Sequence, residues 1–214
     1  MRKNIYRLIL SILALLLLLG WIYSMGYRLI NNPRVILPKY GLVGLVAIVL
    51  YFAVSYCILA TLTSSLSKTS KVIRFVLSPI LGIVLYWFVL HPHTIFMNGF
   101  QKSVRVYNER HNLTHALEEI LSLSPAGSRK IYGNSYFCEE IPSKWRENIP
   151  SMSPDYIICN TLDKHATTIS FEWGGGLAGH FGILLVQEVD DSPDPFKHRH
   201  MKSVIGNLYV YHDK

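Results

Sequence analysis

Acidic residues are missing from the first half of the chain. All 14 Asp and Glu residues lie at or beyond Glu109, whereas 9 of the 21 Lys and Arg residues lie before residue 75. Only 16% of the 214 residues are charged and half are apolar, whereas about a quarter of the residues in soluble domains are charged. The net charge of +7 therefore averages a basic, apolar front and a mildly acidic back. It is no argument for nucleic-acid binding, which we do not expect.

Cysteine is scarce, and the common catalytic motifs are absent. Three cysteines exclude a disulfide-dense small domain, and the sequence has no G-x-S-x-G, paired C-x-x-C or P-loop pattern. Cys57 lies in an apolar run and is expected to pack there. Cys138 and Cys159 are a candidate disulfide in an oxidising compartment, worth roughly 3 kcal/mol in the chain-entropy model. Two separate buried thiols are the alternative.

Three long apolar runs occupy the front of the chain, at about residues 8–25, 40–62 and 73–91. About 20 apolar residues span the ~30 Å hydrocarbon core of a bilayer, and Trp and Tyr residues lie mostly near the ends of these runs, as at membrane interfaces. No Asp, Glu, Lys, Arg or His lies well inside a run, although such residues usually mark ion pathways. We therefore predict that residues 1–92 form an anchor of three transmembrane helices, and that residues 93–214 form a globular domain.

The first run also resembles a secretory signal peptide, because basic residues precede an apolar stretch of suitable length. Residues 21–25 lack the small side chains of a cleavage site, so we favour a retained anchor. Basic residues tend to remain on the cytoplasmic side. With the N-terminus inside, six lie on the inner side, and three lie outside when the domain is not counted. This predicts a multi-pass protein of the cell membrane with a cytoplasmic N-terminus and an extracytoplasmic C-terminal domain.

The second half has the pattern of an α+β domain. Residues 100–123 read as one long helix with an apolar stripe. Strand patterns follow at 156–162, 167–173, 181–188 and 207–212, with clean alternation in the second of them. Short connections between the strands favour antiparallel neighbours. We predict one long helix followed by an antiparallel sheet of about four strands.

A glycine-rich segment between two predicted strands is the strongest candidate for a site. Gly174, Gly176 and Gly179 satisfy G-x-G-x-x-G, but the dinucleotide fingerprint requires a helix where a strand is expected here. A hairpin loop rich in positive φ angles is the simplest interpretation. Alternatively, the N–H groups of Gly174, Gly175, Gly176 and Gly179 form an anion-binding nest assisted by His180.

Two histidines and a carboxylate follow helical spacing, which gives a weaker candidate for a metal site. His111, His115 and Glu118 would share one helix face. The metalloprotease motif needs Glu at position 112, where Asn112 stands, so we favour a solvated polar face and expect no metal or other cofactor.

A compact basic run at residues 197–202 follows an acidic loop. A solvated loop is the default interpretation, and contact with anionic lipid headgroups is the alternative. Taken together, these patterns predict an integral membrane protein that presents a non-enzymatic interaction or ligand-binding domain on the outer face. Its partners would be the bilayer and a protein bound through the membrane helices or the domain. The alternative is a membrane-tethered enzyme using residues 174–179 and His180, with His165, His212 or the 198–200 pair as further candidates.

Overall fold

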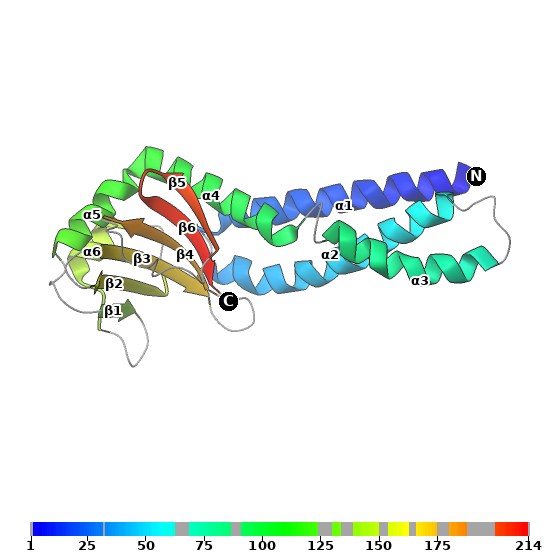
Figure 1. Ribbon diagram of the computed structural model, residues 1–214. Helices are drawn as coiled ribbons and strands as arrows, with labels where there is room; N and C mark the ends of the chain where they lie inside the picture. Colours follow the sequence, from blue (N-terminus) through cyan, green and yellow to red (C-terminus); the bar gives the residue numbers. More distant parts are fainter. Residues whose placement is uncertain are drawn as a thin grey trace.

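The computed structural model describes residues 2–31, 33–62, 69–86, 91–123, 130–133, 139–149, 154–162, 166–174, 180–187 and 200–213. A six-stranded sheet and its covering helices form one end of the molecule, and three helices extend from it (Figure 1). These helices are α1 (Arg2–Arg28), α2 (Pro33–Leu62) and α3 (Thr69–Val84). The N-terminus of α1 lies at the far end of this helical part, whereas the C-terminus of the chain lies beside the sheet.

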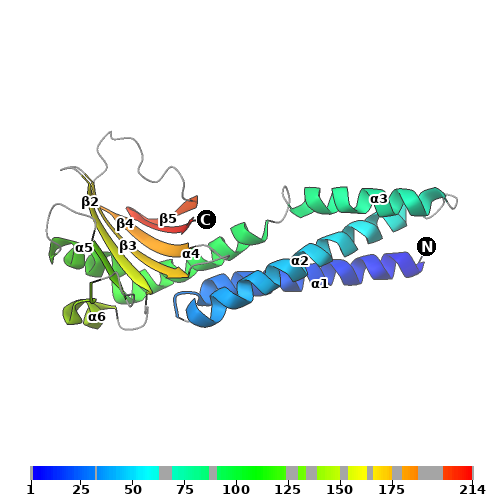
Figure 2. The same ribbon diagram turned by 90° about the horizontal axis from the view of Figure 1, so that it is seen from below.

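Two helices of the described residues are long and apolar enough to cross a membrane, at Ile5–Arg28 and Leu45–Leu62. Helix α3 has 16 residues, or about 24 Å at 1.5 Å per residue, and is not one of these two. The prediction of two apolar helices is confirmed, and that of a third membrane span stays a prediction. Helix α2 packs against both α1 and α3 (Figure 2).

The second half contains α4 (Pro92–His111), α5 (Leu113–Leu123) and the short α6 (Ser143–Asn148). Its strands are β1 (Lys130–Gly133), β2 (Tyr156–Leu162), β3 (Ala166–Gly174), β4 (His180–Val186), β5 (His200–Ile205) and β6 (Leu208–Asp213). The strand order is β1-β2-β3-β4-β6-β5, and every neighbouring pair is antiparallel. The predicted antiparallel sheet and its short connections are confirmed.

The prediction of about four strands was too low, because β1 and β5 were missed. Strand β1 has only four residues and lies at one edge of the sheet. Strand β5 forms the other edge and includes part of the basic run that we interpreted as a loop. Edge strands commonly carry charged side chains, which remove the apolar alternation that marks a strand in the sequence.

The prediction of one long helix at 100–123 was also wrong, because the chain breaks at Asn112. This residue adopts the left-handed conformation with φ 49° and ψ 50°. The backbone N–H and the hydroxyl of Thr114 both donate to the side-chain oxygen of Asn108, at 2.8 and 2.9 Å. Asn is one of the few non-glycine residues that tolerates this conformation, and the Asn108 side chain stabilises the first turn of α5.

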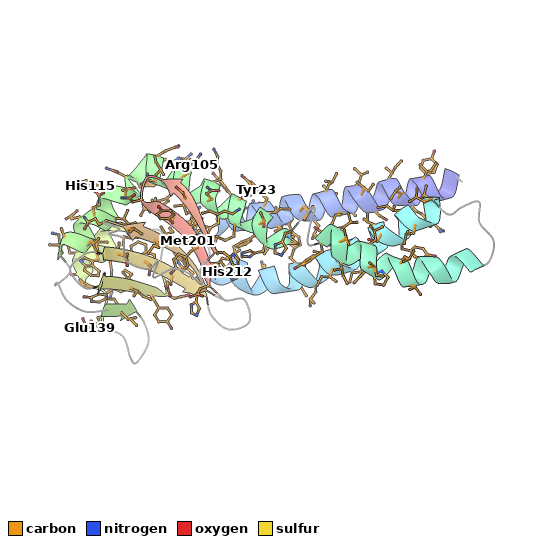
Figure 3. The ribbon with its side chains drawn as sticks, in the orientation of Figure 1. Tyr23, Arg105, His115, Glu139, Met201 and His212 are labelled. Carbon is orange, nitrogen blue, oxygen red and sulfur yellow. The ribbon has the colours of Figure 1, made fainter. Side chains whose placement is uncertain are left out.

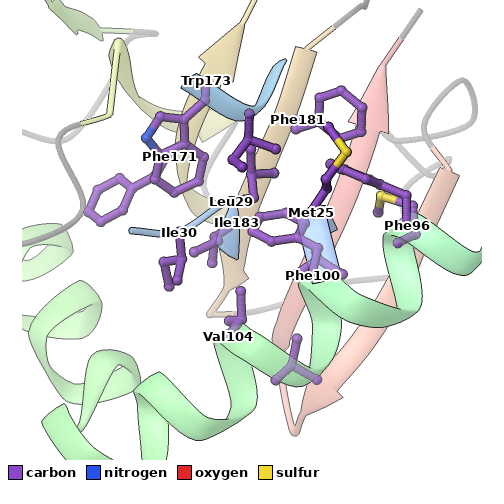
Figure 4. Packing of buried hydrophobic residues seen from close by; sticks show 14 of the residues in the cluster. Met25, Leu29, Ile30, Phe96, Phe100, Val104, Phe171, Trp173, Phe181 and Ile183 are labelled. Atoms are coloured by element: carbon purple, nitrogen blue, oxygen red, sulfur yellow. The ribbon is translucent and has the colours of Figure 1, made fainter. Parts of the chain in front are cut away.

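The core lies between one face of the sheet and the helices α1, α4 and α5 (Figure 4). Alternation in β3 and β4 directs Phe171, Trp173, Phe181 and Ile183 into it, and each of these side chains is fully buried. Helix α4 contributes Phe96, Phe100 and Val104, and the end of α1 with its following turn contributes Met25, Leu29 and Ile30. The last turns of α1 are therefore part of the domain core.

Helices α1 and α4 cross at a pair of glycines. A Cβ on Gly26 would overlap the carbonyl group of Phe96, and a Cβ on Gly99 would overlap the carbonyl group of Tyr23. The two backbones approach so closely that neither position has room for a side chain. This crossing fixes α1 to the first half of α4.

Candidate functional site

Strand β3 ends and strand β4 begins, on either side of the glycine-rich segment, at the end of the sheet nearest helices α1 and α2 (Figure 1). Gly174 and His180 are partners across β3 and β4, whereas Gly175, Gly176 and Gly179 lie outside the described residues. Gly174 has a φ of 94°, which favours glycine. Its N–H donates to the carboxylate of Asp155 at 3.1 Å, so a protein side chain already binds the first N–H group of the proposed nest.

His180 is half-buried, and its Nδ1 atom has no hydrogen-bond partner among the described residues. Strand alternation places this side chain on the sheet face opposite the core, together with those of Glu172 and Tyr211. A buried polar atom without a partner is destabilising unless a ligand or water satisfies it. The geometry therefore leaves His180 as a candidate binding residue.

A hydrogen bond between Glu172 and Tyr211 crosses the middle of this face. Glu172 on β3 and Tyr211 on β6 are both register partners of Gly182 on β4, which lies between them. A Cβ at Gly182 would overlap the phenol ring. The glycine lets the ring of Tyr211 lie across β4 and donate its hydroxyl to Glu172 Oε1. Ser170 donates to the same oxygen at 3.4 Å.

Four histidines gather at the same end of the sheet, on the face that packs against α4 and near the start of that helix. We call His91, His93, His200 and His212 the histidine cluster. The ring of His93 lies 4.4 Å from that of His212, 6.3 Å from that of His200 and 6.1 Å from that of His91, measured between centroids. His200 and His212 are register partners on β5 and β6. Figure 3 labels His212 at the end of the sheet nearest helices α1 and α2.

His93, at the centre of the histidine cluster, resists protonation. Burial, followed by the neighbouring His212, His91, His200 and Lys202, lowers the pKa of His93 to about 3. Burial also lowers the pKa of Lys202, whose ammonium donates to Asn98 Oδ1 at 2.5 Å. His93 is therefore neutral at physiological pH.

The three residues of the weaker metal-site candidate do not share one helix. His111 ends α4 and stacks on Tyr107 with ring centroids 4.5 Å apart, whereas His115 and Glu118 belong to α5, beyond the break at Asn112. Figure 3 shows His115 at the end of the domain far from His212. No group of three or more potential metal ligands is present in the described part of the chain.

The remaining candidates are only partly described. Cys159 is buried in β2, and Cys138 lies outside the described residues, so the proposed disulfide stays a prediction. His165 and His198 also lie outside them.

Sequence reasoning missed the histidine cluster as a unit, although it considered His200 and His212 as separate candidates. His91 lies just before α4 and His93 lies in its first turn, whereas His200 and His212 belong to strands more than 100 residues later. The available signal was alternation, because His200 and Lys202 share one face of β5. Alternation indicates a shared face only in a strand, and residues 197–202 were interpreted as a loop.

No protein-family model, curated protein or solved structure matches the chain.

Proposed function

We propose that the protein is an integral membrane protein in which α1, α2 and α3 cross the bilayer and hold the α+β domain on the outer face. One observation carries this proposal. All but two of the large apolar side chains exposed in the described residues lie on these three helices, the exceptions being Leu123 and Ile205. Soluble proteins rarely expose apolar patches of more than a few hundred Å², so lipid is the environment that suits this surface.

Aromatic residues at the ends of the helical part support the same placement. Trp21, Tyr23 and Tyr27 are exposed near the domain, and Tyr6 is exposed near the far end. Amphipathic rings of this kind are enriched at both interfaces of a bilayer. Between these levels, the exposed side chains of α1 are mostly Leu and Ile.

The packing of α1 supports a retained anchor over a cleaved signal peptide. Removing the helix would also remove Met25 and Leu29 from the domain core, and Gly26 from the contact with α4. Each fully buried large apolar side chain contributes roughly 2 kcal/mol to folding. The core of the domain therefore depends on the end of α1, which favours a helix that is retained.

The orientation rests on the charge count and on the position of the chain ends. The start of α1, the end of α2 and the start of α3 lie at the far end of the helical part, and the domain lies at the other end. Three crossings with the N-terminus inside would place the domain outside, in agreement with the six-to-three excess of basic residues.

We propose that the domain acts as a non-enzymatic module that binds a ligand or partner. The end of the sheet nearest α1 and α2 carries both His180 and the histidine cluster, on opposite faces. A binding surface there would lie next to the bilayer, where it could engage a membrane-bound ligand or another membrane protein.

The apolar surface is tested by placing a charge on it. Leu17 is 75% exposed on α1, so Leu17→Asp would be almost neutral in a soluble protein. Facing lipid, Asp costs about 3 kcal/mol. We expect the variant to lose membrane insertion, measured as the fraction of the protein that resists extraction of membranes by alkaline carbonate.

Leu123→Asp is the matched control, because Leu123 is an exposed leucine of the domain, at 48%. This control should remain in the membrane like the wild type. If carbonate releases the wild-type protein, or if Leu17→Asp inserts as well as Leu123→Asp, α1 does not face lipid and the proposal is wrong.

A membrane-tethered enzyme is the second candidate. The unpartnered, buried Nδ1 atom of His180, on the same sheet face as Glu172 and Tyr211, favours it. His180→Ala should then abolish complementation of a deletion while leaving thermal stability unchanged, with His115→Ala as an exposed control. Full complementation by His180→Ala would exclude a catalytic role for this residue.

A further inference from the structure

An apolar groove lies between the middle of α2 and the C-terminal end of α3. Its walls are Ile48, Tyr51, Phe52, Gly82, Ile83 and Tyr86, and its volume is about 180 Å³. Sites for whole drug-sized ligands usually measure 300–1,000 Å³, so this groove suits part of a chain-like molecule. With apolar walls on two helices that we place in the bilayer, the groove fits a lipid acyl chain.

The groove leads directly to the histidine cluster. Tyr86 lines the groove, and its ring lies 5.3 Å from the ring of His91. His91 in turn lies 6.1 Å from His93, which contacts His212 and His200. A continuous series of rings therefore joins the apolar groove to the histidine cluster.

Groups that attract an anion surround the end of this series. His91 precedes α4, His200 and Lys202 extend from β5, and His212 extends from β6. Helix α4 begins here with no acidic residue in its first turn and no side-chain cap, so its positive dipole end adds to the field. Asp213 follows His212 in the chain, and alternation along β6 directs it to the other face of the sheet.

We propose that the groove and the histidine cluster form one binding site for an anionic phospholipid, with an acyl chain in the groove and the phosphate at the cluster. The proposal rests on the membrane placement of α2 and α3 argued above. Accessible polar groups are available for the phosphate, because His200 is exposed and His91 and Lys202 are half-buried. Such a lipid would bridge the membrane helices and the domain.

The site implies a dependence on pH. The charged and titratable groups that face His93 are His91 beside it, His200 and Lys202 on β5, and His212 on β6. Without an anion, these groups repel one another when protonated, whereas a bound phosphate would stabilise their charged forms. Binding would therefore take up protons, and affinity for the lipid should increase as the pH falls from 8 to 6.

Lipid binding can be measured by native mass spectrometry of the full chain in a non-ionic detergent. The probes are phosphatidylglycerol, phosphatidylcholine with the same acyl chains, and inorganic phosphate. We expect phosphatidylglycerol to bind about tenfold more tightly than phosphatidylcholine, as one charge-assisted hydrogen bond would give. Inorganic phosphate should compete only weakly, because it lacks the chain that the groove holds.

Two pairs of variants separate the two halves of the site. His200→Gln combined with Lys202→Gln should remove the preference for phosphatidylglycerol, whereas Lys102→Gln, at an exposed position of α4, should keep it. Ile83→Trp fills the groove and should weaken both lipids about tenfold. Ile80→Trp, at an exposed position of α3 outside the groove, should leave binding unchanged.

Equal affinity of the wild type for the two lipids would overturn the proposal, as would an unchanged preference in the His200 and Lys202 variant. Full competition by inorganic phosphate would reduce the site to a phosphate site and overturn its lipid half. Thermal unfolding of each variant verifies that it is folded, and Lys202→Arg, which keeps the charge, should retain the preference. A protein that stays in carbonate-washed membranes but shows no preference refutes this inference alone, whereas a protein that leaves them refutes the membrane placement.

Discussion

Substituting either glycine at the crossing of α1 and α4 should force α1 away from α4 and the domain core. Gly26 faces the carbonyl group of Phe96, and Gly99 faces that of Tyr23. Ordinary contacts of a Cβ atom begin near 3.4 Å, so an added methyl group requires the two helix axes to separate by more than ~1 Å. The clash is with backbone atoms, which a change of rotamer cannot relieve.

The cost follows from the core that this crossing holds together. Moving α1 away from α4 loosens the contacts of Met25 and Phe100 with the sheet. Inserting a methyl group into a tightly packed interior typically costs 1–3 kcal/mol, and the rigid backbone here places each variant at the upper end, at about 3 kcal/mol. For a chain of this size, that corresponds to a decrease in Tm of roughly 6–12 °C.

Thermal unfolding of the detergent-solubilised protein, followed by circular dichroism, measures this effect. Gly26→Ala and Gly99→Ala should each lower Tm, and the double variant should lose less than the two decreases added together, because the first separation makes room for the second methyl group. Gly20→Ala is the control, since its Cβ would have nothing within 4 Å and alanine favours a helix by about 1 kcal/mol. If all three single variants unfold at the same temperature, the close crossing does not exist.

Three further changes test other contacts. The pKa of His93 is lowered to about 3 from the ordinary 6.5, so between these pH values the unfolded chain binds a proton that the folded chain does not. The free energy of unfolding should therefore decrease as the pH drops below about 6.5, by about 1 kcal/mol between pH 7 and 5.5. His93→Phe should remove this dependence on pH in thermal melts. Tyr211→Phe removes the donor to the buried Glu172 and should cost about 1–3 kcal/mol in chemical unfolding, so an unchanged midpoint would mean that the hydrogen bond contributes little. Cys138 and Cys159 should react with maleimide in the unfolded protein only after reduction, and labelling of both without a reductant would exclude the disulfide.

The sequence was most informative where a pattern is local. The apolar runs at 8–25 and 40–62 predicted the two long helices, because a run of that length has few other uses. The alternation of Ile169, Phe171 and Trp173 predicted the buried face of β3. These patterns depend only on neighbours in the chain, so one sequence suffices to find them.

Features that join distant segments were not predictable in the same way. The last turn of α1 looks the same in sequence whether it enters lipid or a protein core, and its contact with Gly99 involves a helix about 70 residues later. The helix breaks at Asn112, and Thr114 then donates hydrogen bonds to the side chain of Asn108. The apolar stripe continues across this break and so did not predict it.

The candidate site depends on such distant contacts. The bond between Tyr211 and Glu172 requires the register of three strands and a glycine between them. The histidine cluster requires the placement of α4 against β5 and β6. The sequence identified His180, and also His200 and His212, as candidates, but it gave no reason to join His91 and His93 to them.

The central claim is that the chain crosses the membrane three times and presents its domain on the outer face. Alkaline phosphatase and a fluorescent protein, each fused after Leu62 and after Lys214, test it most directly in a bacterial host, because phosphatase is active only outside and the fluorescent protein only inside. We predict fluorescence without phosphatase activity at Leu62, and phosphatase activity without fluorescence at Lys214. The same signal at both positions would mean that α3 does not cross, and the reverse pattern would place the domain inside; either result would contradict the proposed architecture.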